Sequence, residues 1–274
     1  MARCAPGWFT SCAGTNSRHG CYTAAFGNNG TRYSMKSALK HLSRTLRQPF
    51  NARYAFRRLD EYHARPRTLD EVIHWAMNFG GDGYMRVKTM QIPSEITRLA
   101  RAVEALAPRI ILEIGTASGG TSLIWSTLAS ERVITCDLKD MTHQAPLFSR
   151  FPPPGSNCQV TLLSGDSHSA DFKSRVAREL NGEQVDFLFI DGDHTDAGVT
   201  QDYNDYREFV RPGGLIAFHD IVENQPLDIN QVFYLWQRLK QVGDVEEFID
   251  DPDQCGFGIG ILRVPDQGAP DLPA

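Results

Sequence analysis

Residues 185–198 read VDFLFIDGDHTDAG, an apolar run that ends in Asp191, Gly192, Asp193 and His194. An apolar run of this length, bounded by a polar turn, predicts a buried β-strand. A strand that runs straight into carboxylates and an imidazole either ends in an ordinary polar turn or delivers chemical groups to a cleft. The segments on either side of this stretch decide between the two interpretations.

Apolar runs like this one alternate along the chain with segments of helical spacing. Further strands are predicted at 109–115, 132–138, 158–166, 215–220 and 256–264. Helices are predicted at 92–106, 122–129, about 170–180, 196–210 and 229–242, with a proline-rich loop at 151–157 and an RPGG turn at 211–214. Strands that alternate with helices predict an α/β fold with a doubly wound, mostly parallel sheet.

Each of the first five predicted strands has a carboxylate at or just past its end. These carboxylates are Glu113, Asp137, Asp166, Asp191 and Asp220. A single carboxylate there is typical of a turn or a helix cap, but five along one edge are hard to explain as caps alone. Ligands of doubly wound sheets bind outside the carboxyl ends of the strands. The pattern therefore favours a cleft that carries chemistry.

The composition of the 274 residues, 41% hydrophobic and 22% charged, is typical of a globular protein with a sizeable core. No apolar run is long enough to span a bilayer, and the start lacks the pattern of a secretory signal. The six cysteines form no C-x-x-C pair, which argues against a zinc site. They are sparse for a disulfide framework, which favours a cytoplasmic protein.

The N-terminal section differs in charge from the rest of the chain. Residues 1–67 hold 12 of the 28 Lys and Arg residues but 2 of the 33 acidic ones, a net charge of +10, which leaves −15 for the remainder. We expect disorder at 1–34, a basic helical extension or lid at 35–84 that begins with a helix at 35–47, a main domain at 85–265 and a flexible tail at 266–274. A basic helix can contact a membrane surface, an anionic partner or nucleic acid, or it can pack on the body or on a second copy.

We favour packing, with a homo-oligomer formed through the N-terminal helices as one form of it, because the apolar face is narrow and aromatic residues do not interleave. The acidic body would repel phosphates, and no N-P-P-Y-type motif is present, so we expect no nucleic-acid partner.

The first strand runs into EIGTASGG, residues 113–120. Gly115 allows a tight turn, and Gly119 and Gly120 allow a ligand to approach the backbone at a helix N-terminus. Ala117 breaks the G-x-G-x-x-G pattern, and no Lys-Ser/Thr follows, so the loop is not a P-loop. Asp137 ends the second strand, where a carboxylate can accept hydrogen bonds from a ribose diol.

This combination resembles the class I S-adenosylmethionine-dependent methyltransferases. With GDSH, FLFIDGDHT, VRPGGLIAFHD and GFGIGIL, residues 85–264 resemble methyltransferase family 24, also labelled cephalosporin-hydroxylase-like. The resemblance implies a seven-stranded Rossmann-like sheet with a helical N-terminal extension and S-adenosyl-L-methionine as cofactor. It implies that Glu113 and Gly115 lie near the methionine portion and Asp137 at the ribose. The full implied cofactor set is Glu113, Gly115, Thr116, Ala117, Ser118, Gly119, Asp137, Leu138, Asp166, Ser167, His168 and Asp191, with Asp166, Ser167 and His168 around the adenine.

Asp191 and Asp220 end adjacent predicted strands and offer two hard oxygen ligands that suit Mg²⁺. This resembles the metal-dependent O-methyltransferases of the catechol and macrolide-sugar types, which hold Mg²⁺ at the corresponding strand ends. Here the fifth strand ends in His219 and Asp220, where those enzymes have an acidic pair or an Asp-Asn pair. We therefore predict a site for Mg²⁺ or another divalent cation with Asp191, His219 and Asp220 as ligands.

His194 follows Asp191 by three residues, where the resemblance places a general base, and an imidazole titrates near neutrality. We predict His194 and Asp191 as catalytic residues of an O-methyltransferase that acts on a hydroxyl of a small molecule, such as a sugar or another polyhydroxylated natural product. Asp193 is better explained as a turn residue. Segments 78–92 and 141–157 are predicted lids over the acceptor.

Two alternatives stay open at this point. His194, His219 and one Asp could form a two-His-one-carboxylate iron site of a non-haem hydroxylase. The chain could also bind the cofactor without turnover.

Overall fold

The structure, a computed structural model, describes residues 35–273, and the disorder predicted for residues 1–34 lies outside the described residues. The contacts between residues group the chain into two units, and the boundary between the units falls after Arg47. Helix α1 (Met35–His63) begins in the first unit, and Gln48 onward forms the second, compact unit. Within residues 35–273, no helix is long and apolar enough to cross a membrane.

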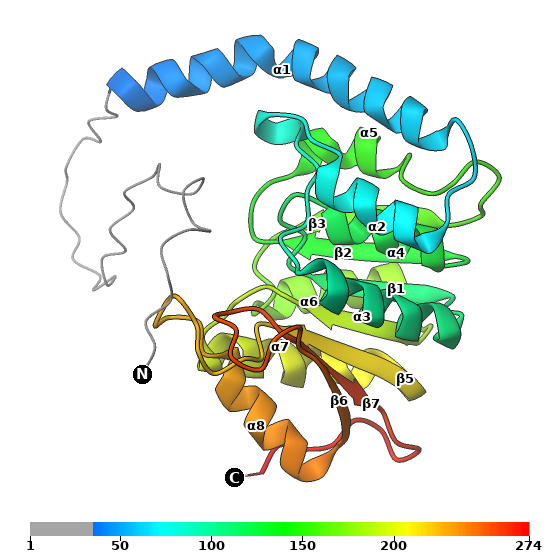
Figure 1. The fold of residues 1–274 in the computed structure, drawn as a ribbon, viewed down its shortest axis with the longest axis vertical. Helices are drawn as coiled ribbons and strands as arrows, with labels where there is room; N and C mark the ends of the chain where they lie inside the picture. Colours follow the sequence, from blue (N-terminus) through cyan, green and yellow to red (C-terminus); the bar gives the residue numbers. More distant parts are fainter. Residues whose placement is uncertain (1–34, 274) are drawn as a thin grey trace. The chain divides into compact units, whose positions relative to one another are not determined.

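A seven-stranded sheet forms the centre of the second unit, with the strand order β3-β2-β1-β4-β5-β7-β6 (Figure 1). The strands are β1 (Ile110–Ile114), β2 (Arg132–Asp137), β3 (Gln159–Ser164), β4 (Val185–Ile190), β5 (Val210–His219), β6 (Asp244–Phe248) and β7 (Ile259–Arg263). Strands β1 to β5 pair in parallel, and β7 runs antiparallel to both β5 and β6. The predicted fold class is therefore confirmed. The order reverses between β1 and β4, which is where such sheets open a ligand crevice.

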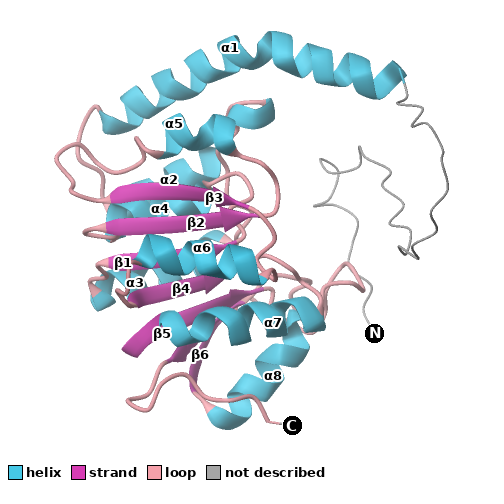
Figure 2. Ribbon diagram, turned by 180° about the vertical axis from the view of Figure 1, so that it is seen from behind, coloured by secondary structure: helices cyan, strands magenta, loops and turns pink. Residues whose placement is uncertain are grey.

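Helices cover both faces of this sheet. Helices α2 (Leu69–Asn78), α3 (Pro93–Leu106), α4 (Gly120–Leu128) and the short α5 (Ala145–Phe148) share one apolar core with the C-terminal part of α1. Helices α6 (Ala170–Leu180), α7 (Asp196–Tyr206) and α8 (Val232–Val242) share the other core and lie in front of the sheet in Figure 2. Three short 3₁₀ helices complete the described elements: η1 (Gly83–Met85), η2 (Thr142–Gln144) and η3 (Arg207–Phe209).

Strand β4, the apolar run of the opening stretch, is buried along its whole length. Successive side chains of a strand point to opposite faces, so its residues contribute to both cores. Phe187 and Phe189 pack edge-on against Trp125 of α4, with ring centroids 5.1 and 5.6 Å apart. Burial of each such side chain stabilises the fold by about 1.5–3 kcal/mol. The strand that carries Asp191 is therefore held firmly at the centre of the molecule.

Some sequence predictions of local structure are wrong in extent. The helix predicted at 35–47 continues to His63 with Pro49 inside it, because Ala55 and Leu59 are buried in the first core and stabilise the later turns. The RPGG turn lies inside β5, where the register with β4 shifts and Gly213 takes a φ of +75°. Strand β6 was not predicted.

The predicted domain boundary near residue 85 does not coincide with the division seen in the structure. Residues of α2, such as Val72 and Ile73, are buried in the same core as Ile111 of β1. In the described residues this part belongs to the compact unit that begins at Gln48.

Cys136 and Cys158 are buried free thiols.

Candidate active site

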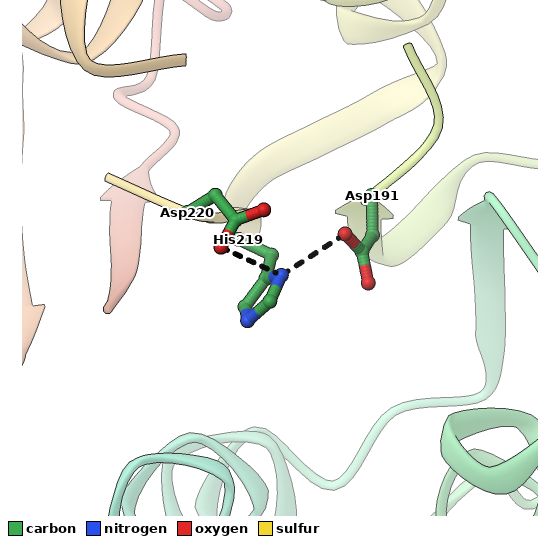
Figure 3. Close-up of side chains that lie close together, drawn as sticks. All are labelled: Asp191, His219 and Asp220. Atoms are coloured by element: carbon green, nitrogen blue, oxygen red, sulfur yellow. Dashed lines mark hydrogen bonds and ion pairs between the residues drawn. The ribbon is translucent and has the colours of Figure 1, made fainter. Parts of the chain in front are cut away.

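Asp191 and Asp220 follow the adjacent strands β4 and β5, whose last residues pair in register. His219, the last residue of β5, lies between the two carboxylates (Figure 3). Its Nδ1 atom is 3.1 Å from Asp191 Oδ1 and 3.5 Å from Asp220 Oδ1. One ligand-type atom from each residue lies within 4.8 Å of the others, so the three predicted metal ligands come together.

Asp220 takes an unusual backbone conformation, with a φ of +63°. A non-glycine residue in the left-handed region costs about 1–3 kcal/mol and needs support from its surroundings. The backbone N–H of Phe257 donates to Asp220 Oδ1 at 3.1 Å, and Asn230 Nδ2 donates to Oδ2 at 2.6 Å. These bonds hold the carboxylate towards His219 at the edge of the sheet.

His194 completes the cluster from the loop that follows Asp191. Its Nε2 atom is 3.4 Å from Asp191 Oδ1, and its Nδ1 atom is 2.8 Å from Asp220 Oδ2. The carbonyl oxygen of His194 accepts a hydrogen bond from the backbone N–H of Gln231 at 2.7 Å. The predicted base therefore lies against both predicted metal ligands.

The charges within this cluster are strongly coupled. Burial alone would raise the pKa of Asp191, but His219 and His194 hold that pKa well below its usual range. Burial would lower the pKa of both histidines, but the two carboxylates raise it to about 10 for His194 and about 9 for His219. With these pKa values, each histidine carries a proton at neutral pH beside the two carboxylates.

The donor set fits a divalent cation. Two carboxylates offer hard oxygen ligands, and an imidazole is a common ligand of transition metals. His219 Nε2 is also buried with no hydrogen-bond partner among the described residues.

Gly115 connects the glycine motif to this cluster. It takes a φ of +101°, and a Cβ atom there would lie 2.0 Å from the carbonyl oxygen of Asp191. Only glycine lets the end of β1 pack this closely on the end of β4. The spaces beside Gly119 and Gly120 are filled by Phe148 and by the backbone of residues 88–89, so the structure does not show the ligand approach expected at these two glycines.

Glu113 lies inside β1, and its carboxylate points into the core. It is completely buried and accepts hydrogen bonds from Ser122, Thr135 and Trp125, with Trp125 Nε1 at 2.8 Å. Burial raises the pKa of Glu113. The side chain leaves no exposed atom for the methionine portion of a cofactor, and it ties helix α4 to β1 and β2 instead.

Asp137, the last residue of β2, shapes the loop beside it. Its Oδ2 accepts a bond from the N–H of Ala117, and its Oδ1 accepts one from the N–H of Lys139, both at 2.8 Å. The next residue, Leu138, is 76% exposed. Thr116 is buried with its hydroxyl bonded to Thr135, whereas Ser118 is half-buried.

Asp166, Ser167 and His168 follow β3 as predicted. The N–H of His168 donates to Asp166 Oδ1 at 3.0 Å, and the Ser167 carbonyl accepts a bond from Tyr206. His168 Nε2 lies 3.2 Å from Asp202 Oδ1 of α7, a fully buried carboxylate. Asp202 raises the pKa of His168 to about 9, with smaller contributions from Asp193 and Asp166.

Comparisons with known proteins identify the family and the fold of the part of the chain that carries this cluster. Residues 112–221 match a family model described as a methyltransferase domain, of family 24. The range runs from β1 to just past β5 and contains every predicted site residue. This part of the chain is a methyltransferase domain.

Solved structures share the fold of the methyltransferase domain. The O-methyltransferase TomG from Streptomyces achromogenes, involved in tomaymycin synthesis and solved with S-adenosylmethionine, is similar at 16% identity and a TM-score of 0.54. That match covers 73% of this chain and 91% of TomG. MycE methyltransferase from the mycinamycin biosynthetic pathway, solved with Mg and S-adenosylhomocysteine, is similar at 17% identity and a TM-score of 0.52. That match covers 77% of this chain and 58% of MycE. The predicted class I methyltransferase is confirmed.

The structure of the methyltransferase domain also reveals residues that sequence reasoning missed. Gln91, which precedes α3, donates through Nε2 to Asp191 Oδ2 at 3.1 Å. Asn230 contacts both Asp220 and His194, and Asp202 pairs with His168. None of the three belongs to a recognisable motif. The one available signal was that segment 78–92, a predicted lid, contains Gln91.

Proposed function

We propose that the protein is an S-adenosylmethionine-dependent O-methyltransferase that uses a divalent cation to methylate a hydroxyl group of a small molecule. The observation that carries this proposal is the cluster of Asp191, His219 and Asp220 at the carboxyl edge of the sheet, in direct backbone contact with Gly115. A cation site and a cofactor loop that touch each other can bring a hydroxyl and a methyl donor together.

The cofactor would lie across the crevice between β1 and β4. Asp137 keeps unused lone pairs on its carboxylate oxygens for a ribose diol, because each oxygen accepts one backbone hydrogen bond. Leu138 offers an exposed apolar side chain, and residues 166–168 follow β3, the strand that pairs with β2. In this proposal Glu113 positions α4 and does not contact the cofactor.

Residues of the cluster would share the work of activating the acceptor hydroxyl. Held by Asp191, Asp220 and the softer ligand His219, a divalent cation would polarise the hydroxyl and lower its pKa. His194 is the proposed base, and its Nε2 atom faces the same carboxylate as His219. The two carboxylates raise the pKa of His194 to about 10, so this histidine can act as a base only when a bound cation offsets their charge and lowers that pKa.

The acceptor that we propose is a sugar or another polyhydroxylated natural product. TomG and MycE, which share the fold, belong to natural-product pathways, and MycE was also solved with mycinamycin VI. Met90, in the proposed lid 78–92, is 66% exposed beside the buried Gln91 and can contact such an acceptor. A cytoplasmic location, the lid 141–157 and oligomerisation through the N-terminal helices remain part of the proposal.

Calorimetry with S-adenosylhomocysteine tests the cofactor half of this proposal, and exhaustive chelation tests the cation half. We expect micromolar binding of the nucleoside and loss of methyl transfer after chelation, restored by Mg²⁺ or Mn²⁺. Folded protein that does not bind S-adenosylhomocysteine would contradict the proposed cofactor. Full activity after chelation would contradict the proposed cation.

A second function has one observation in its favour. His194, His219 and Asp191 lie close enough together to form a two-His-one-carboxylate iron site of a hydroxylase. Iron-dependent oxygen uptake without S-adenosylmethionine would support this alternative. We favour methyl transfer because the fold is that of a methyltransferase.

A further inference from the structure

Each of the two proposed metal-binding carboxylates is held by one side-chain amide from outside the strand ends. Gln91 Nε2 donates to Asp191 Oδ2 at 3.1 Å, and Asn230 Nδ2 donates to Asp220 Oδ2 at 2.6 Å. In both cases the bonded oxygen is Oδ2, which leaves Oδ1 to face His219. The two amides therefore fix the rotation of the two carboxylates in the same way.

In both amides the N–H group is hydrogen-bonded, whereas the oxygen atom is left without a hydrogen-bond donor among the described residues. Gln91 Oε1 and Asn230 Oδ1 are buried with no hydrogen-bond partner among the described residues. A buried acceptor without a partner costs about 1–3 kcal/mol. Turning either amide round would not remove that cost, because it would place a carbonyl oxygen against a carboxylate oxygen. Packing thus keeps the N–H groups on the carboxylates even though the oxygens stay unpaired.

Both amides come from segments that are anchored independently of the cluster. The segment before Gln91 is bonded to α2 through the N–H of Thr89, which donates to Ala76, and it packs on Gly120 of α4. Gln91 itself is only 6% exposed. The segment around Asn230 is held by Gln231, whose Oε1 atom accepts a hydrogen bond from the backbone N–H of Asp196 in α7 at 3.2 Å. Donors on such supports can act as fixed points for the carboxylates.

We propose that Gln91 and Asn230 are positioning residues that orient Asp191 and Asp220 for a divalent cation, an inference that rests on the proposed function. Groups that hydrogen-bond metal ligands orient them, and losing one such group commonly weakens metal affinity by 10- to 100-fold. Gln91 also links the proposed acceptor lid to the cation site, because it lies at the end of segment 78–92.

Mn²⁺ binding to the full chain, followed by electron paramagnetic resonance, tests this proposal without any acceptor. Gln91→Met and Asn230→Leu remove the donors and keep much of the side-chain volume. We expect each to weaken Mn²⁺ binding by about tenfold or more. The affinity for S-adenosylhomocysteine and the melting temperature should stay close to those of the wild type.

Two control variants match these changes on the same segments. Thr89→Val alters a buried residue whose hydroxyl is unpartnered among the described residues, and Leu227→Ala truncates a side chain that is 61% exposed on the segment of Asn230. Both should bind Mn²⁺ within about twofold of the wild type.

Three outcomes would overturn the proposal. If the test variants bind Mn²⁺ as the wild type does, the positioning roles are wrong and the proposed function stands. If they lose Mn²⁺ affinity together with S-adenosylhomocysteine binding and thermal stability, the amides have a general structural role. If the wild type itself does not bind Mn²⁺, both the cation half of the proposed function and this inference fail.

Discussion

Glu113 lies in β1 and Asp191 directly follows the neighbouring strand β4, yet their environments differ sharply. Glu113 accepts bonds from neutral donors only, and burial raises its pKa. Asp191 faces His219 and His194, and these cations hold its pKa down despite burial. A buried carboxylate with neutral donors can serve as a structural hydrogen-bond acceptor, whereas one that keeps its charge needs a cation beside it. Position in or just past the last residues of a strand is therefore insufficient to identify a catalytic acid.

Removing the charge of Asp191 is the strongest test of this difference between the two carboxylates. Asp191→Asn keeps the shape but weakens cation binding and the pairing with both histidines. We expect methyl transfer to fall by about 10³-fold or more, since a cation supplies several kcal/mol of transition-state stabilisation. Single-turnover rates with S-adenosylmethionine measure the loss, and calorimetry should show less than a tenfold change in cofactor affinity. A variant with the wild-type rate would place the chemistry elsewhere.

His194→Ala should have the next largest effect. General bases contribute about 10²–10⁴-fold, so we expect a rate loss of about 10²-fold with little change in the dissociation constant of S-adenosylhomocysteine. The variant also removes a positive charge from Asp191 and Asp220, and Mn²⁺ should bind at least as tightly as in the wild type. An unchanged rate would reject the base, and weakened Mn²⁺ binding would make His194 a ligand.

Changes at Glu113 should act on stability. Glu113→Ala leaves a cavity and unpaired donors on Ser122, Thr135 and Trp125, so the free energy of unfolding should fall by about 3 kcal/mol. Glu113→Gln resembles the protonated acid and should cost about 1 kcal/mol or less. Urea denaturation measures both. Equal losses in the two variants, or a Glu113→Ala variant with unchanged stability, would contradict a structural role.

Asp202, which pairs with His168, is a third kind of buried carboxylate. Its substitution should have the smallest of these effects. Asp202 raises the pKa of His168 from 6.5 to about 9 in the folded state. The stabilisation is therefore complete below about pH 6.5 and is lost as the pH rises through 9. We expect the stability difference between the wild type and Asp202→Asn to shrink by about 2–3 kcal/mol between pH 6 and pH 10 in urea titrations. A difference that does not vary with pH would show that the pair carries no such charge.

Much of the fold and part of the site follow from sequence alone. Alternation of apolar runs with helical segments predicts the parallel sheet, and parallel strands place their carboxyl ends on one edge. Asp191, His219 and Asp220 could be grouped for that reason, since β4 and β5 are adjacent in the chain and in the sheet. The glycine motif likewise predicts the tight turn at Gly115, whose φ of +101° needs glycine.

The partners of these groups were decided only by tertiary structure. Gln91 lies 100 residues from Asp191 in the chain, and Asp202 of α7 reaches His168 in the turn that follows β3. Whether Glu113 faces a ligand or the core depends on the donors that α4 and β2 bring to it. The sequence determines which residues lie at the strand ends, because the bounds of each strand depend on the local pattern of apolar and polar residues. Packing determines their charge and role, because the pKa and orientation of a buried group depend on neighbours that are distant in the chain.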